Sequence, residues 1–483
     1  MALGEFAPIV PVGLLAAWAC CLLIVDLFVP PNRRGITAGL AAMAIVTALV
    51  AVVALAGRQV GSPDSMVVGD GSGAFFQAIL LVGALFSVAL AFDYIRRTGI
   101  ERGEYYILLL FSLSGMLLLA IASDLVIVFL GLELLSIPLY VLAGFALPKA
   151  DSEESALKYF LLGAFSSSFL VFGIALAYGS TGTTNLYGIA HQASSGQADM
   201  PLLLVASLMV LVSLAFKVAV VPFHMWTPDV YQGAPTSVVA FMTVGSKVAG
   251  FAVLLRVLTG AFPALSPYWS QVAVGIAAVT MVWGNVAAVG QASIKRMLAY
   301  SSIAHAGYVF MAIPAAAIPT LQSQAYSAAL FYLLAYSLTS LGAWGVVLAV
   351  EHAQGGGTGI EDYAGLGARR PLLAAAMTVF MLSLTGVPPT VGFVAKFVLF
   401  QTVLDARLTG LALIGVLTTL VAAYYYLRVV VNMYMRSGLP DVRSERWLNL
   451  TIGAMAVAVV LLGLLPQPIL RAAYQVGIAS FLP

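Results

Sequence analysis

The sequence predicts an all-α polytopic membrane protein with about fourteen transmembrane helices. Of its 483 residues, 61% are apolar and only 9% are charged, and the mean hydropathy is +1.02. Soluble domains carry roughly 25% charged residues, so this composition excludes a soluble globular protein. Apolar runs of about 18–25 residues, each long enough to cross a bilayer, follow one another along nearly the whole chain.

Polar or Gly/Pro breaks set the limits of each expected span. The first run has full spanning length and follows Glu5 rather than a basic segment, which does not fit a cleavable signal peptide. The fourth and fifth spans are separated only by Ser123-Asp124. The spans fall near 8–28, 36–56, 74–92, 105–122, 124–147, 155–179, 201–225, 235–259, 268–288, 297–314, 324–350, 371–400, 408–432 and 447–471.

Lysine and arginine residues alternate between the two sets of loops. Loops after odd-numbered spans carry thirteen, namely Arg33, Arg34, Arg96, Arg97, Arg102, Lys149, Lys295, Arg296, Arg369, Arg370, Arg436, Arg443 and Arg446. Loops after even-numbered spans carry three, Arg58, Arg256 and Arg407. The positive-inside rule therefore predicts a multi-pass protein of the bacterial inner membrane with both termini on the periplasmic face. A wrong number of spans would have destroyed this alternation.

Two halves of the chain resemble each other. "ALKYFLLGAFSSS" (156–168) is similar to "ALFYLLAYSLTSL" (329–341), and "VSLAFKVAVVPF" (212–223) corresponds to "LSLTGVPPTVGF" (382–393). An offset of about 170 residues equals five helices, an odd number, which predicts two repeats of inverted topology. The expected organisation is an N-terminal three-helix segment (1–104), a first antiporter-like repeat of spans 4–8 (105–260), a second, inverted repeat of spans 9–13 (261–435) and a C-terminal helix (436–483).

Two expected spans, the seventh and the twelfth, contain proline where a helix should continue. The prolines are Pro222 in the first case and Pro388 and Pro389 in the second. An interior proline removes a backbone hydrogen bond, and within a membrane the freed carbonyls are satisfied by protein or water, so broken helices line cavities. Lys217 lies shortly before Pro222, and Lys396 shortly after Pro389. We interpret the two breaks as parts of a hydrated ion path rather than as isolated kinks.

Four charged residues lie inside expected spans: Glu133, Lys217, Lys247 and Lys396. A charge at the bilayer centre costs roughly 2.5–3.5 kcal/mol on insertion scales. The expected partners of Glu133 are Lys217 and, as an auxiliary, Lys158, and a pair whose separation changes can take up and release a proton. A structural salt bridge is the alternative for this pair. Small residues around Lys247 predict close helix packing, with snorkelling to the interface as its alternative.

Two histidines lie near these charges. His305 in "SSIAHAGY" has serine and tyrosine nearby and a near-neutral reference pKa, which suits a proton relay. A hydrogen-bonded interior histidine without a relay role is the alternative. His224 follows Pro222, and we expect it to cap the broken helix rather than to bind a metal.

Nothing in the sequence indicates a cofactor. There is no cluster with metal-ligand spacing, no phosphate loop, no dinucleotide fingerprint after a strand and no Ser-His-acid arrangement. The adjacent Cys20 and Cys21 point in different directions on a helix, which disfavours a disulfide between them. A net charge of +2 gives no reason to expect nucleic acid.

Three segments carry a resemblance to a known family: "FKVAVVPFHMWTPDVYQGAPT" (216–236), "IKRMLAYSSIAHAGY" (294–308) and "SLTGVPPTVGFVAKF" (383–397). They resemble the antiporter-like subunits of proton-pumping NADH:quinone oxidoreductase, respiratory complex I, and most of all its N-type members. Three features indicate this subtype: the motif "DVYQGAPT", the absence of a long lateral helix after about fourteen spans, and Lys396 in place of the glutamate of M-type members.

The resemblance implies a role for each buried charge. Glu133, Lys217, Lys247 and Lys396 match the proton-channel positions of the family, and His305 matches a polar position between its half-channels. The resemblance also implies a translocase subunit that holds no redox site, with flavin, iron–sulfur clusters and quinone in partner subunits, and with M-type and small membrane subunits as neighbours. Three alternatives remain: a subunit of a sodium/proton antiporter without redox coupling, a structural membrane-arm scaffold, and a similar arm fed by a hydrogenase or another electron donor.

Overall fold

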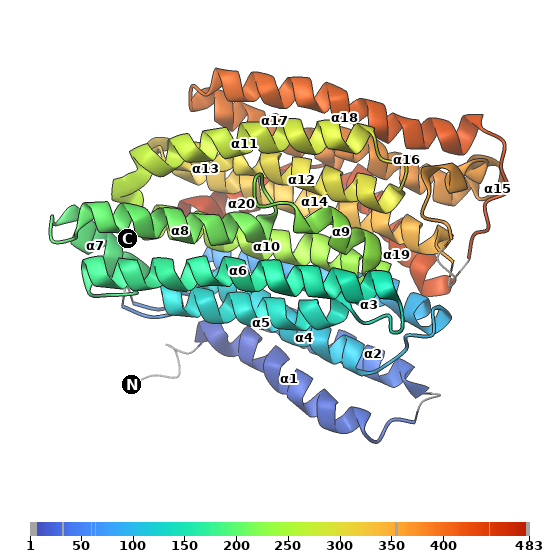
Figure 1. Ribbon diagram of the computed structural model, residues 1–483, viewed down its shortest axis with the longest axis horizontal. Coiled ribbons are helices and arrows are strands. Elements are labelled where there is room, and N and C mark those ends of the chain that lie inside the picture. The colour runs from blue at the N-terminus through green and yellow to red at the C-terminus, as the bar shows by residue number, and fades with distance from the viewer. Residues whose placement is uncertain are drawn as a thin grey trace.

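Figure 1 shows a computed structural model in which long helices lie side by side in one elongated bundle. The structure describes residues 7–30, 33–58, 60–62, 64–352, 356–443 and 445–479. Within these ranges the chain forms helices and connecting loops, with only isolated β-bridges between loops. Helix α1 (Val10–Asp26) lies at one edge of the bundle and α18 (Thr409–Met435) at the opposite edge.

The number of spans agrees with the sequence prediction once the broken and short helices are included. Twelve helices among the described residues are long and apolar enough to cross a membrane. Two expected spans fall outside this set. The tenth is α12 (Ile294–Phe310), which is 17 residues long and is followed by α13 (Ala312–Ala316). The twelfth is divided into α16 (Pro371–Thr385) and α17 (Val391–Asp405). The predicted all-helical polytopic membrane fold is confirmed.

The first three helices pack against one another and against the rest of the bundle. Helices α1 and α2 (Gly35–Leu55) pack on each other, and α3 (Gly71–Arg97) packs on α2, α4 and the central helix α10. Asp70 sets the start of α3, because its carboxylate accepts the backbone N–H of Gly73 at 2.7 Å and so satisfies one free donor of the first turn.

The next set of helices begins with a hairpin. Asp124 caps α5 by accepting the N–H of Val126 at 2.8 Å, so α4 and α5 are two helices joined by a tight turn, as predicted. Helix α5 continues through Pro138, so this interior proline does not break it. The short helix α7 was not predicted. The set comprises α4 (Glu104–Ile121), α5 (Leu125–Ala143), α6 (Ala150–Thr181), α7 (Leu186–Ser194), α8 (Met200–Val218), α9 (Trp226–Gly233) and α10 (Thr236–Gly260).

The following set repeats the same order of elements. It comprises α11 (Ser266–Val289), α12, α13, α14 (Gln322–Val350), α15 (Leu366–Arg369), α16, α17 and α18. Each set thus contains a helical hairpin, a long helix, a broken helix and a final long helix. The inverted relation between the two sets and the limits of the four sequence segments stay predictions.

The C-terminal region differs from the expected single helix. It contains α19 (Arg446–Leu464) and a second helix, α20 (Gln467–Ala479), which packs against α14 and α3. Pro466 follows Leu465 between them, and a proline restricts the preceding residue and cannot donate to the helix, so α19 ends there.

Helices α10 and α14 form the centre of the protein. Each is buried on nearly all sides, and they pack against each other. Helix α10 also contacts α3, α4 and α8, while α14 also contacts α16, α17 and α19. A helix that is apolar all round belongs in such an interior. The polar residues that these two helices carry are consequently enclosed by protein.

Candidate functional site: a buried lysine and histidine axis

The two broken helices end in the same way. Helix α8 ends at Val218 because Ala219 adopts a left-handed conformation with φ 61°, and α16 ends at Thr385 because Gly386 does so with φ 89°. These two residues are 167 positions apart (386 − 219), close to the predicted offset. The predicted breaks near Pro222, Pro388 and Pro389 are confirmed. Helix α8 ends four residues before Pro222 and α16 ends three residues before Pro388, since the left-handed residue already ends the hydrogen-bonding pattern.

A buried lysine closes each break. The Nζ atom of Lys247, on α10, donates to the carbonyl oxygen of Val218 at 3.0 Å. The Nζ atom of Lys396, on α17, donates to the carbonyl oxygen of Thr385 at 2.9 Å. In both cases the acceptor is the last residue of the first half-helix, where the helix dipole is negative and a carbonyl lacks its usual partner. Lys247 and Lys396 thus occupy equivalent places at the two breaks.

Gly386 makes the second closure sterically possible. A Cβ atom at this position would lie 2.8 Å from Cδ of Lys396, and the positive φ also disfavours any L side chain. Close approach is likewise required at Gly250 on α10, where a Cβ atom would lie 2.6 Å from Cγ1 of Val218. The small residues predicted around Lys247 do allow close helix packing.

Lys217 lies at the end of α8 and faces α5 and α6. Its Nζ atom donates to Oγ of Ser136 at 2.7 Å and to the hydroxyl of Tyr159 at 3.4 Å. Glu133 is half-buried and accepts a hydrogen bond from Ser167. The charged groups of Glu133 and Lys217 form no ion pair among the described residues. Ser136, three residues after Glu133 on the same helix, takes the place expected for the carboxylate.

The two auxiliary residues lie outside this buried contact. Lys158 pairs with Glu154 at 2.7 Å and with Asp229 at 2.8 Å, so the expected pairing with Glu133 is not present. The ring of His224 packs against Trp283, and its Nδ1 atom is buried without a hydrogen-bond partner. His224 was expected to cap the broken helix, but Trp226 does so in addition to Lys247. The indole N–H of Trp226 donates to the carbonyl of Phe216 at 3.1 Å.

His305 is held between two tyrosines. Its Nδ1 atom is 2.9 Å from the hydroxyl of Tyr332 on α14, and its Nε2 atom is 3.2 Å from the hydroxyl of Tyr426 on α18. Tyr426 in turn hydrogen-bonds to Ser301. Both ring nitrogens therefore contact groups that can donate or accept a proton, an arrangement that suits a relay.

A further polar chain begins at Lys396. Its Nζ atom lies 3.4 Å from Oγ1 of Thr419 and 4.7 Å from the ring centroid of Tyr308. Thr419 donates to the hydroxyl of Tyr308 at 3.2 Å. That hydroxyl also accepts from Asn285 at 3.2 Å, and Asn285 accepts from Tyr425 at 3.0 Å. The hydrogen-bonded chain links α17, α18, α12 and α11. Its threonine and tyrosine hydroxyls can each act as donor or acceptor.

A small cavity separates His305 from the second break. Its volume is about 10 Å³, and His305, Thr339, Ser383 and Gly392 are among the residues that line it. This volume is near the minimum that accommodates one water molecule. Oγ of Ser383 is 3.0 Å from Oγ1 of Thr339, so a water placed here would have polar partners.

The sequence interpretation missed a buried ion pair. Lys295 was counted among the loop charges, but it lies in the first turn of α12, where its Nζ atom is 3.8 Å from Oε1 of Glu351 and 3.1 Å from the carbonyl of Ala234. Both side chains are buried. The other carboxylate oxygen of Glu351 and the hydroxyl of Tyr363 are buried without a hydrogen-bond partner. The available signal was Glu351, an acid four residues before the Gly-rich stretch that begins at Gly355.

Several buried hydroxyl groups lie on the helices around the Lys295–Glu351 pair and His305. Buried polar atoms are normally hydrogen-bonded, to protein or to ordered water. Among the described residues, five such hydroxyls on α9, α10, α12 and α14 make no short, well-directed hydrogen bond: Thr227, Thr236, Ser237, Ser302 and Tyr336. Three of them nevertheless lie near tyrosine hydroxyls: Thr236 near Tyr94, Ser237 near Tyr105, and Ser302 near Tyr231 and Tyr336. The ring of Tyr336 lies 5.2 Å from that of His305. This part of the interior is consequently suited to hold water.

Comparisons with known proteins identify the family. A family model described as NADH:quinone oxidoreductase/Mrp antiporter, transmembrane, matches residues 122–422. NADH-quinone oxidoreductase subunit N of Chloroflexus aggregans is 44% identical over 465 residues, which cover 95% of this chain and 94% of that protein. The chain belongs to the NADH-quinone oxidoreductase subunit N family. Subunit N 1 of Herpetosiphon aurantiacus is 46% identical over 94% of this chain and 93% of its own length. The resemblance inferred from the three motifs is confirmed.

Solved structures agree with this assignment. A chain of respiratory complex I from Thermus thermophilus with bound aureothin has a TM-score of 0.82 and 35% identity, and the match covers 96% of this chain and 99% of that one. A chain of the Mrp complex from Dietzia has a TM-score of 0.85 at 23% identity, over 99% and 97% of the two chains. The fold is therefore shared beyond the subunit N family.

Proposed function

We propose that this subunit N family member moves protons across the membrane along Lys217, Lys247, His305 and Lys396, while other subunits carry electrons from NADH to quinone. The observation that carries the proposal is the pair of equivalent helix breaks, each closed by a buried lysine. An ammonium that holds a free carbonyl can release its proton and leave this contact. An ionisable side chain inside the membrane is costly to bury, so its presence there indicates a role in function rather than in packing.

Glu133 would control the first lysine of this axis. In the described arrangement Lys217 contacts Ser136, which lies one helical turn from Glu133. A small shift of α5 along α8 would exchange the serine hydroxyl for the carboxylate. The approach of the carboxylate favours the charged form of Lys217, and its withdrawal favours release of the proton. Such shifts of packed helices are a common element of switching.

We further propose that protons reach the axis from the cytoplasm through the Lys295–Glu351 pair. This pair lies where loops rich in lysine and arginine meet, which the positive-inside rule assigns to the cytoplasmic face. The buried hydroxyls of α9, α10, α12 and α14, together with the tyrosines that several of them face, would hold water between the pair and His305. Release would occur near Lys396 toward the periplasm, where both termini are placed by the same rule.

The remaining assignments follow the family. Flavin, iron–sulfur clusters and quinone would be held by partner subunits, and this chain would contain no redox site or metal. Its neighbours would be an M-type antiporter-like subunit and the small membrane subunits, with the NADH-oxidising arm reached through the complex. No nucleic-acid partner is proposed.

The test is to replace Lys217 or Glu133 by alanine in the intact complex and to reconstitute that complex in liposomes. We expect NADH-driven proton uptake per electron to fall at least severalfold in both variants, with assembly unchanged. Lys217→Arg should retain part of the activity because it keeps a positive charge. Arg436→Ala, which removes an exposed arginine at the end of α18, is the control and should pump normally.

Two results would overturn the scheme. The first is a Lys217→Ala complex that reduces quinone and pumps with the full stoichiometry. The second is purification of the chain exclusively with membrane subunits that carry cation exchange and no flavin or iron–sulfur protein, which would favour the antiporter alternative.

A further inference from the structure

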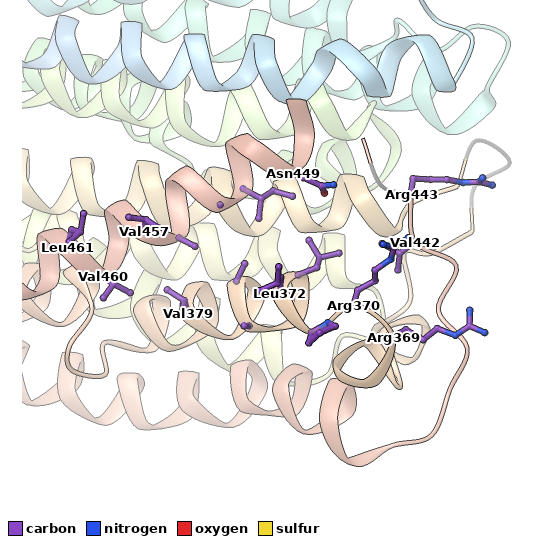
Figure 2. Close-up of a pocket in the computed structure, with 17 residues that line it drawn as sticks. Arg369, Arg370, Leu372, Val379, Val442, Arg443, Asn449, Val457, Val460 and Leu461 are labelled. Carbon is purple, nitrogen blue, oxygen red and sulfur yellow. The ribbon is translucent and has the colours of Figure 1, made fainter. Parts of the chain in front are cut away.

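A long groove lies on the outer surface of the bundle between α16 and α19 (Figure 2). Its volume is about 810 Å³, within the usual range of ligand sites. Its walls are apolar along most of its length, and include Leu372, Val379, Val457 and Leu461. Both helices run side by side through the membrane-spanning part of the protein. The groove therefore opens toward the lipid rather than toward water.

One end of the groove is strongly basic. Figure 2 shows Arg369, Arg370 and Arg443 gathered at this end, away from Val460 and Leu461. Arg443 is 3.5 Å from Asp441, with both side chains more than half exposed. Arg369 and Arg370 form no ion pair with any residue that the structure describes. Glu445, which lies two residues after Arg443, is already paired with Arg97 at 2.8 Å. Two exposed positive charges are thus left at the mouth of an apolar groove.

We infer that this groove binds an anionic phospholipid. Its phosphate would contact Arg369 and Arg370, and its acyl chains would lie along α16 and α19. Guanidinium groups bind phosphate oxygens in a bidentate manner, which makes arginine the favoured residue for this head group. Helix α16 begins at Pro371, so the positive end of its dipole lies at the same place.

Charge complementarity decides between a lipid and a protein occupant. Acyl chains are already in apolar surroundings in the bilayer, so the apolar walls alone favour neither a lipid nor a transmembrane helix. The arginines, in contrast, require an anion at the membrane surface. By the positive-inside rule this end of the groove faces the cytoplasm, and the cytoplasmic leaflet is the one that is rich in anionic lipid.

The lipid site would act on the second break through α16. The last residue of this helix, Thr385, supplies the carbonyl that Lys396 holds. A lipid packed along α16 would stabilise the position of that half-helix relative to α19. The inference itself does not depend on proton transfer, since lipid binding can be measured in a complex that does not pump.

The test uses the intact complex and phosphatidylglycerol that carries a photoreactive group on one acyl chain. We expect crosslinks, mapped by mass spectrometry, in peptides from 371–385 and 446–464. Unlabelled phosphatidylglycerol should compete with the probe, and phosphatidylcholine should not. The double variant Arg369→Gln/Arg370→Gln should lose about tenfold or more of this labelling, since each arginine contributes to anionic-lipid attraction.

Arg436→Gln is the matched control, because it removes one exposed arginine from the same face without touching this groove. It should retain labelling. Equal competition by phosphatidylcholine, or unchanged labelling in the double variant, would overturn the inference. So would crosslinks that occur only in a neighbouring subunit, because a partner helix would then occupy the groove. The competition arm applies to the unmodified complex, so it remains decisive if the double variant does not assemble.

Discussion

Gly386→Ala tests whether the closed second break is needed for transport. Gly386 follows the last residue of α16 and has φ 89°. A methyl group here would lie 2.8 Å from Cδ and 3.6 Å from Cε of Lys396. Because Lys396 is flexible and Thr385 belongs to the helix, the lysine is the group that must move. The substitution therefore displaces the ammonium without removing its charge.

The cost has two parts. An L side chain in the left-handed region costs about 1–2 kcal/mol. Weakening the hydrogen bond between the Lys396 ammonium and the carbonyl of Thr385 costs about 1.5–3 kcal/mol, the usual range for a charged partner. The backbone strain lowers the stability of the folded protein and does not by itself slow transport. If transport requires the contact between Lys396 and Thr385, a loss of about 1.5–3 kcal/mol corresponds to a rate about tenfold to about 150-fold lower.

The assay is NADH-driven proton uptake by the reconstituted complex, measured together with NADH oxidation and with the temperature of thermal inactivation. Gly275→Ala is the neutral control, since nothing lies within 4 Å of its Cβ position. Ala219→Gly is the reverse change at the first break, where a non-glycine residue already has φ 61°, and should leave transport intact. Normal proton uptake by an assembled Gly386→Ala complex would refute the reasoning.

Two further substitutions distinguish residues needed for proton transport from residues needed for stability. Thr419→Val keeps the shape but interrupts the link between Lys396 and Tyr308, so we expect transport to slow about fivefold, the effect of about 1 kcal/mol, at unchanged thermal stability. A matching fall in stability would count against a transport role. Arg256→Gln removes the partner of Asp70 at 2.9 Å and should destabilise the protein by about 3 kcal/mol, as broken buried pairs do. The protons moved per electron by the surviving Arg256→Gln complex should stay unchanged, and uncoupled electron transfer would contradict this assignment.

The helices and their breaks could be predicted because their causes are local. Bilayer thickness fixes the length of an apolar run, and a proline removes a hydrogen bond wherever it lies in a helix. A local signal is not sufficient, however, to say where a helix ends. Pro138 resembles Pro222 in sequence, yet α5 continues through it while α8 ends before Pro222. What ends α8 is the left-handed backbone of Ala219, an alanine that carries no such signal.

The partners of the buried charges could not be predicted in the same way. Glu133 and Lys217 were expected to pair because they are opposite charges inside expected spans, where a buried carboxylate near an ammonium can remain charged. The sequence contains no information on how far one helix is shifted along another, and it is this axial position that puts Ser136 rather than Glu133, one turn earlier on the same face, against Lys217. Lys295 was placed among loop charges for the same reason, because burial near Glu351 depends on where the end of α14 lies.

The sequence by itself determined that this protein is a bundle of membrane helices with charges where charge is expensive, and its motifs indicated the family. Those properties depend on composition and spacing along one chain. Only the tertiary structure decided which groups each charge contacts. Lys247 closes the break at Val218 from 29 residues away, and His305 meets Tyr426 from 121 residues away. Such contacts arise when helices pack, since packing brings together groups that no local pattern relates.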